Sequence, residues 1–458
     1  MIMKGMNVSA IAAACGGNLY GEFPSEFLSE KEASCVVIDS RLIEKDGVFI
    51  ATKGERVDGH DFIPQVFEKG ALAVVCEKLP ENPAGPCILV KDSFEALRKI
   101  AAYYRTELSC HVVGITGSVG KTSTKELIAS VLRQGKKTCA TEKNFNNDIG
   151  VPLTVLRIRE DDEYAVIEMG INHFGEMSEL TKIVHPDTVV FTNIGECHLE
   201  NLHDRDGVLK AKSEIFEGLT GNGNVIVNAS DDKLCSLKEV AGKPTVRYGF
   251  DESFDVYASK IGNVNFEGTD AVLNIKGKEP LSVHIPLPGK HMVLNACAAA
   301  AMGISAGLSL TQIKNGIESV PVTEGRSHII KTDSFNIIDD CYNANPTSMK
   351  AALDLLSGSE GRKAAILGDM FELGADEAKL HASVGEYAVR LKTDLLVCIG
   401  NLSKNMFKAA EGSDTEAHWY ASVDDFIRDA STVLKGADTV LIKASHSMNF
   451  GKIVEELK

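Results

Sequence analysis

The residue types between Gly114 and Thr122 are suited to holding a phosphate group. This stretch reads Gly-Ile-Thr-Gly-Ser-Val-Gly-Lys-Thr, follows an apolar run and opens a helical pattern. Glycines let backbone N–H groups turn toward an anion, and a helix N-terminus adds partial positive charge. We expect Lys121 to reach the β and γ phosphates of ATP and Thr122 to present its hydroxyl to Mg²⁺.

The spacing of this loop leaves other interpretations open. From Gly117 it reads G-x-x-G-K-T, which is shorter than the usual G-x-x-x-x-G-K-[ST]. The alternative is a glycine-rich turn with an exposed lysine. Kinases, motors, switches and ligases all use phosphate loops, so the loop predicts nucleotide binding without naming a reaction.

Three further residues have the chemistry of a metal site. Glu168 ends the apolar run Tyr164–Met169, where an acid points into the crevice at the carboxyl edge of a parallel sheet. His198 follows the next run, Thr188–Ile194, and Lys212 lies in a helical pattern. Each residue taken singly has an alternative role. Glu168 would cap a helix, His198 would be structural, and Lys212 would be a solvated lysine. A desolvated lysine can be neutral and take up CO₂, which would give a carbamate ligand.

Apolar strands alternate with helical patterns on both sides of a β-rich segment, Tyr257–Ile285. Such alternation predicts parallel sheets covered by helices. The predicted strands are His111–Ile115, Tyr164–Met169, Thr188–Ile194 and Asn224–Val227, then Asn336–Asp340, Lys363–Leu367, Leu395–Ile399 and Thr439–Lys443. The predicted helices include Phe94–Glu107, Lys121–Gln134, Gly207–Leu219, His291–Ala306, Thr347–Leu356, Ala375–Lys392 and Val423–Leu434.

We therefore expect an α/β protein of three domains. Residues 1–88 form a mixed α/β substrate domain, and the three prolines of Pro80–Pro86 indicate a linker at its end. Residues 89–320 form the central phosphate-loop domain, with a parallel sheet and the small β region. Residues 321–458 form a doubly wound, Rossmann-like domain.

Composition limits the partners and the compartment. A net charge of −16 argues against binding to nucleic acid or anionic membrane. The eleven cysteines are scattered with no C-x-x-C pair, which is typical of reduced thiols in the cytosol. No run is long enough for stable membrane insertion, and the N-terminus has no secretion signal. We expect a cytoplasmic monomer.

These motifs, in this order, resemble the Mur ligase family over nearly the whole chain. They are the phosphate loop, Asn144-Phe-Asn-Asn147, Glu168-Met-Gly, Asn193-Ile-Gly-x-x-His198, Ala211-Lys212 and Pro288-Gly-x-His-x-x-x-Asn295. Within the family, three segments are similar to the branch that adds D-alanyl-D-alanine to UDP-N-acetylmuramoyl-tripeptide: Asp39–Phe62, Asn144–Pro152 and Asp340-Cys-Tyr-Asn-Ala-Asn-Pro346. The family often ends in K-G-S-R, whereas this chain has Lys443-Ala-Ser-His446.

The resemblance implies an ATP- and Mg²⁺-dependent amide ligase that makes the pentapeptide precursor of peptidoglycan. It implies ATP contacts from Gly117, Ser118, Val119, Gly120, Lys121, Thr122, Ser123, Asn295 (adenine), Arg326 (phosphates) and Asp340 (ribose). It implies metal contacts from Thr122, Glu168, His198 and a carbamylated Lys212, and catalytic roles for Lys121, Glu168, His198 and Lys212. It implies substrate contacts from Ser40, Arg41, Lys53, His60, Asn146, Asn147, Asn343 and Asn345.

Two other functions remain open from sequence alone. One is a related ligase that adds a single amino acid or acts on a folate-like substrate. The other is a nucleotide-regulated switch that closes its domains on ATP without forming a bond. The roles of Lys443 and His446 are also open, with either a substrate role or a plain strand-end lysine and surface histidine.

Overall fold

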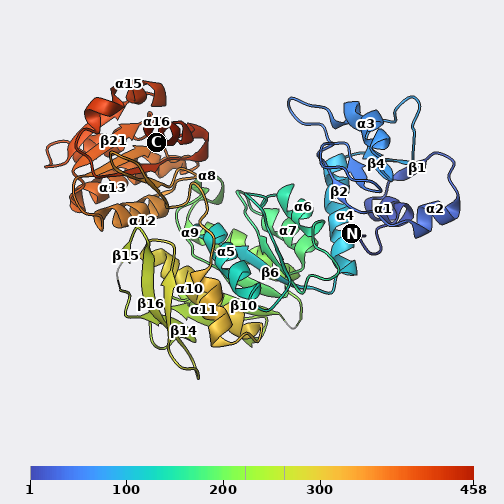
Figure 1. The fold of residues 1–458 in the computed structure, drawn as a ribbon, viewed down its shortest axis with the longest axis horizontal. Helices are drawn as coiled ribbons and strands as arrows, with labels where there is room; N and C mark the ends of the chain where they lie inside the picture. Colours follow the sequence, from blue (N-terminus) through green and yellow to red (C-terminus); the bar gives the residue numbers. More distant parts are fainter. Residues whose placement is uncertain (1, 222, 263) are drawn as a thin grey trace.

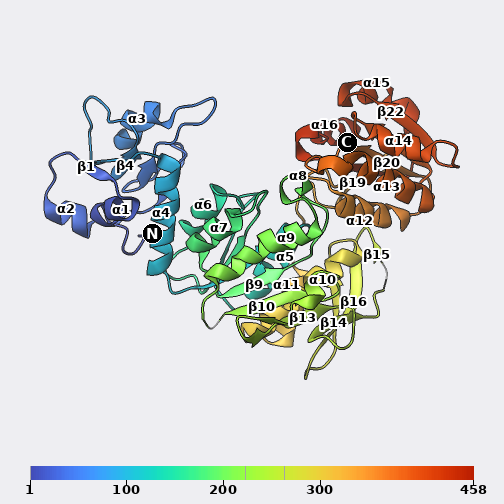
Figure 2. The ribbon, with the colours of Figure 1, turned by 180° about the vertical axis from the view of Figure 1, so that it is seen from behind.

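The computed structural model describes residues 2–458 apart from 222 and 263. Three α/β units follow one another along an elongated molecule, with the N-terminal and C-terminal units at opposite ends of the central one (Figures 1 and 2). The predicted three-domain α/β architecture is confirmed. Among the described residues, no helix combines the length and apolar character needed to cross a membrane.

The N-terminal unit is built on a five-stranded sheet in the order β1-β5-β4-β3-β2. All neighbours in it are parallel except β1 and β5. Its elements are α1 (Val8–Cys15), β1 (Asn18–Tyr20), α2 (Ser25–Glu30), β2 (Val36–Val37), β3 (Val48–Ile50), η1 (Gly59–Phe62), α3 (Ile63–Glu68), β4 (Ala73–Cys76) and β5 (Cys87–Leu89).

The proline-rich segment Pro80–Pro86 is not a linker, so that prediction was wrong. It joins β4 to β5, which are paired neighbours in one sheet. Proline lacks only the N–H donor, and the Pro86 carbonyl still accepts from the Val74 N–H of β4 at 3.0 Å. The sequence pattern is the same for a loop within a domain and for a linker.

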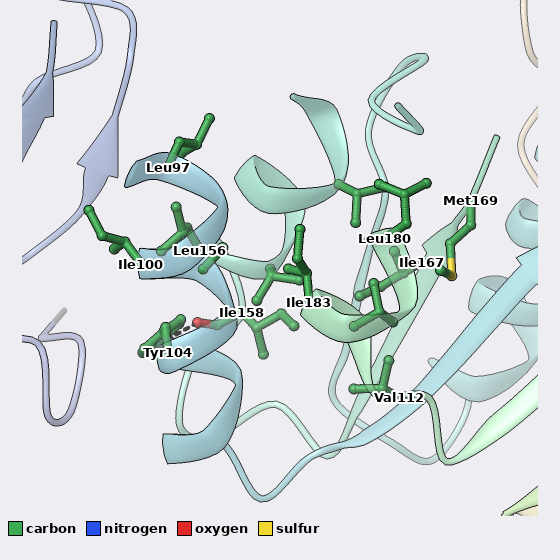
Figure 3. Close-up of a cluster of buried hydrophobic side chains, with 14 of the residues drawn as sticks. Leu97, Ile100, Tyr104, Val112, Leu156, Ile158, Ile167, Met169, Leu180 and Ile183 are labelled. Carbon is green, nitrogen blue, oxygen red and sulfur yellow. Dashed lines mark hydrogen bonds between the residues drawn. The ribbon is translucent and has the colours of Figure 1, made fainter. Parts of the chain in front are cut away.

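Helix α4 (Ser93–Glu107) joins the N-terminal unit to the central one, and it packs against α1, α6 (Gly150–Val155) and α7 (Glu176–Val184). Asp92 caps its first turn by accepting from the backbone N–H of Glu95, 2.8 Å away. Its apolar face contributes Leu97, Ile100 and Tyr104 to a buried cluster (Figure 3). One continuous core therefore connects the two units.

The Tyr104 hydroxyl donates to the backbone carbonyl of Ile158 at 2.7 Å, and the side chain is 1% exposed (Figure 3). Tyr104→Phe should leave that carbonyl buried without a donor and lower the free energy of unfolding by about 1–2 kcal/mol. Urea unfolding followed by circular dichroism measures this. Tyr103→Phe is the control, because its half-buried hydroxyl bonds Gly5 at 3.2 Å. Equal losses in both variants would contradict the assignment.

The central unit has a ten-stranded sheet in the order β15-β16-β14-β13-β10-β9-β6-β8-β7, with β17 paired to β16. Its elements after α4 are β6 (His111–Thr116), α5 (Lys121–Leu132), β7 (Thr138–Ala140), α6, β8 (Tyr164–Glu168), α7, β9 (Thr188–Phe191), α8 (Leu199–Leu202), α9 (Arg205–Ser213), η2 (Glu214–Gly218), β10 (Asn224–Asn228), η3 (Leu234–Ser236), β11 (Glu239–Val240), β12 (Lys243–Pro244), β13 (Val246–Gly249), β14 (Val256–Ser259), β15 (Val264–Asn265), β16 (Gly268–Ile275), β17 (Leu281–Ile285), α10 (Lys290–Ser305) and α11 (Leu310–Glu318).

Strand β6 lies between β8 and β9, and all three run parallel. The segments that follow these strands therefore meet at one edge of the sheet. Helices α5 and α10 pack together beside the sheet, and their buried residues share a core with β6 and β9. This arrangement brings the phosphate loop, Glu168 and the segment after β9 to one place.

The C-terminal unit has a six-stranded sheet in the order β18-β19-β23-β20-β21-β22, parallel except for β18. Its elements are β18 (His328–Lys331), β19 (Asn336–Asp339), α12 (Pro346–Ser357), β20 (Lys363–Gly368), η4 (Gly374–Asp376), α13 (Glu377–Arg390), β21 (Leu395–Ile399), α14 (Lys404–Ala410), β22 (Glu416–Tyr420), α15 (Val423–Val433), β23 (Thr439–Lys443), η5 (His446–Met448) and α16 (Gly451–Leu457). Its η4 lies against α8 of the central unit.

Candidate active site

A cavity of about 760 Å³ opens where the central and C-terminal units meet. Its walls come from the loop after β6, the segments after β8 and β9, helix α10 and the segment after β19. Arg98 of α4 also lines it. Polar side chains from separate elements therefore face one common space.

The phosphate loop is held in shape by the end of β9. Gly117 has a φ of 146°, and a Cβ there would lie 2.0 Å from Thr192 Oγ1, so only glycine fits. Thr192 donates its hydroxyl to the carbonyl of Val119 at 2.6 Å, and Asn193 Oδ1 accepts from the Val119 N–H at 2.8 Å. Lys121 Nζ donates to the Gly117 carbonyl at 2.7 Å. The loop is thus preorganised at the start of α5.

Glu168 and Thr122 place two oxygens side by side. Thr122 Oγ1 donates to Glu168 Oε2 at 2.8 Å, and Asn146 Nδ2 donates to Glu168 Oε1 at 2.7 Å. Thr141 Oγ1 accepts from the Glu168 N–H at 3.0 Å. Neighbouring ligands of an octahedral Mg²⁺ are about 2.9 Å apart, given its metal–oxygen distances. The two oxygens fit such an ion, and Glu168 is only 1% exposed.

His198 lines the same cavity, and Lys212 is buried nearby on α9. Burial lowers the pKa of His198 below its usual range, which favours the neutral imidazole that metals bind. Burial lowers the pKa of Lys212 to about 8. Among the described residues, no carboxylate is bonded to the amine to oppose this shift. A useful fraction of that amine is therefore uncharged at neutral pH.

No group of three His, Cys, Asp or Glu side chains within the described residues is close enough to form a metal cage. Mg²⁺ commonly keeps several waters and binds through one or two carboxylates together with substrate phosphates. Thr122 and Glu168 supply one hydroxyl and one carboxylate, which fits this mode of Mg²⁺ binding.

On the C-terminal side, Asp340 is fixed by two partners. Lys443 Nζ lies 2.6 Å from Asp340 Oδ2, and the Ser327 N–H donates to Asp340 Oδ1 at 3.0 Å. Lys443 is 2% exposed and also donates to the Asn343 carbonyl at 2.8 Å. It is therefore a buried brace for the segment after β19 rather than a plain strand-end lysine.

The ring of Tyr342 contacts two further side chains on the C-terminal side of the cavity. The Arg326 guanidinium lies 4.0 Å from the ring centroid of Tyr342, in a cation–π contact. His446 is exposed, and its ring centroid is 5.6 Å from that of Tyr342. Arg326 is thus oriented at the cavity wall, and His446 remains on the surface behind Tyr342.

Two of the asparagines predicted to contact substrate also accept hydrogen bonds from backbone N–H groups. Asn345 caps α12 by accepting from the Ser348 N–H at 2.8 Å, and Asn147 accepts from the Gly150 N–H at 2.9 Å at the start of α6. Asn295 is 6% exposed, with Oδ1 3.3 Å from a Cβ position on Gly120. It therefore closes the space beside the phosphate loop.

Most predicted site residues line this single cavity. They are Ser118, Val119, Gly120, Lys121, Thr122, Ser123, Asn146, Asn147, Glu168, His198, Asn295, Arg326, Asp340, Asn343 and Asn345. Gly117 and the buried Lys212 are not among the residues that line it.

The structure does not bring the four N-terminal residues to this cavity. Arg41 is exposed and pairs with Asp39, and the Ser40 carbonyl accepts from Lys69 Nζ at 2.9 Å. His60 bonds Asp58 through Nδ1 and accepts the Glu77 N–H at Nε2.

Lys53 is exposed, and its backbone pairs with that of Asp58. The roles of these four residues toward a UDP-sugar stay predictions.

Four residues of the site were not given a role from sequence. Thr192 and Asn193 clamp the phosphate loop, and their place directly after a strand could have indicated this. Thr141 orients Glu168, and buried Lys125 donates to the Thr141 carbonyl at 2.6 Å. Nothing in the sequence distinguishes Lys125 from a solvated helix lysine.

Three family models match the chain. They are the Mur ligase family catalytic domain over residues 32–105, the Mur ligase middle domain over 115–303 and the Mur ligase glutamate ligase domain over 325–446. The chain belongs to the Mur ligase family. The resemblance predicted from its motifs is confirmed.

Particular relatives match over most of the chain. The UDP-N-acetylmuramoyl-tripeptide–D-alanyl-D-alanine ligase of Bacillus subtilis is 39% identical over 433 residues, covering 92% of both chains. The ligase of that name from Escherichia coli is 35% identical, covering 92% of this chain and 93% of its own.

Two solved structures are similar in fold. A crystal structure of MurF from Acinetobacter baumannii has a TM-score of 0.89 at 30% identity, covering 100% of this chain and 99% of its own. MurF ligase from Thermotoga maritima in complex with ADP has a TM-score of 0.80 at 26% identity, covering 95% and 98%.

Proposed function

We propose that this chain is an ATP-dependent ligase that joins D-alanyl-D-alanine to UDP-N-acetylmuramoyl-tripeptide, a step of peptidoglycan synthesis. The observation that carries the proposal is the full-length similarity to ligases of that name, from Bacillus subtilis and Escherichia coli. A phosphate loop and a buried carboxylate at one cavity, shared by two units, are what such a reaction needs. The Thermotoga maritima relative, solved with ADP, supports ATP as the nucleotide.

The chemistry explains why ATP is required. A carboxylate is a poor electrophile because oxide is a poor leaving group. Transfer of the γ-phosphoryl group to the tripeptide carboxylate gives an acyl phosphate and releases ADP. The amine of D-alanyl-D-alanine then attacks the acyl carbon, loses a proton and expels phosphate, which forms the amide. No protein nucleophile takes part, so the protein contributes positioning, charge stabilisation and exclusion of water.

We propose the following division of labour. Lys121 screens the repulsion between the γ-phosphate and the carboxylate, while Thr122, Glu168 and His198 hold Mg²⁺, which neutralises phosphate charge when bound. The carbamate of Lys212 is a further metal ligand. Asn295 faces adenine, Arg326 the phosphates and Asp340 the ribose. Residues 1–88 hold the UDP group, 89–320 the ATP, and 321–458 the dipeptide and the closing lid.

ADP release by the purified chain should require UDP-N-acetylmuramoyl-tripeptide, D-alanyl-D-alanine and Mg²⁺ together. The requirement follows because phosphoryl transfer needs an acceptor carboxylate and turnover needs the amine. A coupled assay measures ADP, and mass spectrometry identifies the new amide. Steady ATP hydrolysis without either peptide substrate would favour a nucleotide switch, and amide formation with a single amino acid would favour another ligase of the family.

A further inference from the structure

One loop of the C-terminal unit contacts the segment that carries His198. This loop, Asp369–Gly374, follows β20 and leads into η4, which lies against α8. Helix α8 lies at the border with the C-terminal unit (Figures 1 and 2). The Glu372 carboxylate is hydrogen-bonded to His198 Nδ1. The Glu372 carbonyl accepts from the Glu200 N–H at 3.1 Å. Side chain and backbone of one residue thus hold the two units together beside the cavity.

Both contacting residues have unusual backbone conformations. His198 has a φ of 54° and Glu372 a φ of 63°, in the left-handed region that residues with a Cβ disfavour. Such conformations persist where the surrounding structure fixes them, and they concentrate at functional sites. Here they occur on both sides of one contact between units.

The loop that presents Glu372 is itself firmly held. The Met370 N–H donates to buried His381 Nε2 at 2.9 Å, and the Phe371 N–H donates to Ser445 Oγ at 3.0 Å. His381 Nδ1 bonds the Glu377 carbonyl at 2.7 Å, which fixes its ring. The C-terminal unit therefore fixes the backbone next to Glu372, from which the exposed side chain reaches His198.

A carboxylate at Nδ1 determines where the imidazole proton lies. Nδ1 must donate, so the lone pair of the neutral ring is on Nε2. Histidines that bind metals commonly donate their other ring N–H to a carboxylate, which fixes ring orientation and raises ligand basicity. His198 lines the cavity, whereas Glu372 is not among the residues that line it.

We propose that Glu372 is a positioning residue for His198. It holds the ring and its tautomer from the C-terminal unit, so metal binding by His198 in the central unit depends on this one contact from the C-terminal unit. The inference rests on the proposed metal-binding role of His198. It gives the interface between the units a part in assembling the site before any peptide substrate binds.

Binding of Mn²⁺ in the presence of ADP tests this, with free Mn²⁺ measured by electron paramagnetic resonance. Glu372→Ala should weaken one class of Mn²⁺ sites by about tenfold or more. Glu372→Gln should lose less, because its amide oxygen can still accept from Nδ1. In a His198→Ala background, Glu372→Ala should cause no further loss, since its effect acts through that ring.

The matched control is Thr347→Val. Thr347 Oγ1 donates to Glu196 Oε2 at 2.8 Å, another hydrogen bond between the same units that involves neither His198 nor Glu372. We expect its Mn²⁺ affinity to match the unmodified chain. The proposal is overturned if Glu372→Ala leaves Mn²⁺ affinity unchanged or raises it, if Thr347→Val weakens binding equally, or if the loss persists without His198. Because no peptide substrate is present, these outcomes are independent of whether the ligation reaction is correct.

Discussion

Lys121→Met will lower the turnover number for ADP release by about 10²–10³-fold. Removing one preorganised hydrogen-bond donor that stabilises charge on a reacting oxygen usually costs this much. Lys121 starts α5 directly after the phosphate loop, and its Nζ lies 2.7 Å from the Gly117 carbonyl. Burial lowers the pKa of this lysine, and the nearby Glu168 carboxylate opposes that shift. The prediction rests on the proposed role of Lys121, which is to screen the repulsion between the γ-phosphate and the tripeptide carboxylate.

The effect should fall on turnover more than on nucleotide affinity, because the charge matters most as phosphate is transferred. Titration calorimetry with ADP and the coupled assay separate the two. Lys137→Met removes an exposed lysine of the same unit, paired with Asp161, and should leave turnover unchanged. If Lys121→Met keeps more than about a tenth of the turnover, the lysine has no such role in phosphoryl transfer.

The parallel strands were predictable because both of their faces are buried. The predicted strands Leu395–Ile399 and Thr439–Lys443 coincide with β21 and β23, in which every residue is buried. The edge strand β22 (Glu416–Tyr420) is only half-buried and has no continuous apolar run, so it was not predicted. Helix α1 (Val8–Cys15) was missed for a related reason, since eight residues are too few to show a clear period.

The site was predictable where one segment supplies several groups, and less so where distant segments meet. The phosphate loop and Glu168 follow strands, so their neighbourhood follows from the topology of a parallel sheet. The contact of Glu372 with His198 joins residues 174 positions apart, and nothing in the local pattern indicates it. The bracing role of Lys443 was likewise not predictable, because it depends on an ion pair with Asp340 that forms only in the folded chain.

Lys212→Ala will lower turnover by about 10²-fold, and short carboxylic acids such as acetate will restore part of it. Metal-site partners commonly contribute 10–100-fold to affinity or activity, and a directly ligating carbamate belongs at the upper end of that range. Lys212 is 1% exposed, and burial lowers the pKa of its amine to about 8, so roughly a tenth of the amine is neutral at pH 7 and able to take up CO₂. Added carboxylate would occupy the space and charge that the carbamate leaves.

Lys210→Ala is the matched control, because Lys210 lies on the same helix α9 but is exposed. Its turnover should be unchanged, with or without acetate. Degassed, bicarbonate-free buffer should reduce the activity of the unmodified chain and leave that of Lys212→Ala with acetate unaffected, since only the first depends on CO₂. Turnover by Lys212→Ala equal to that of Lys210→Ala would exclude the carbamate. Activity that is lost but not rescued would instead assign Lys212 the part of a cation, because an acetate ion cannot replace a positive charge.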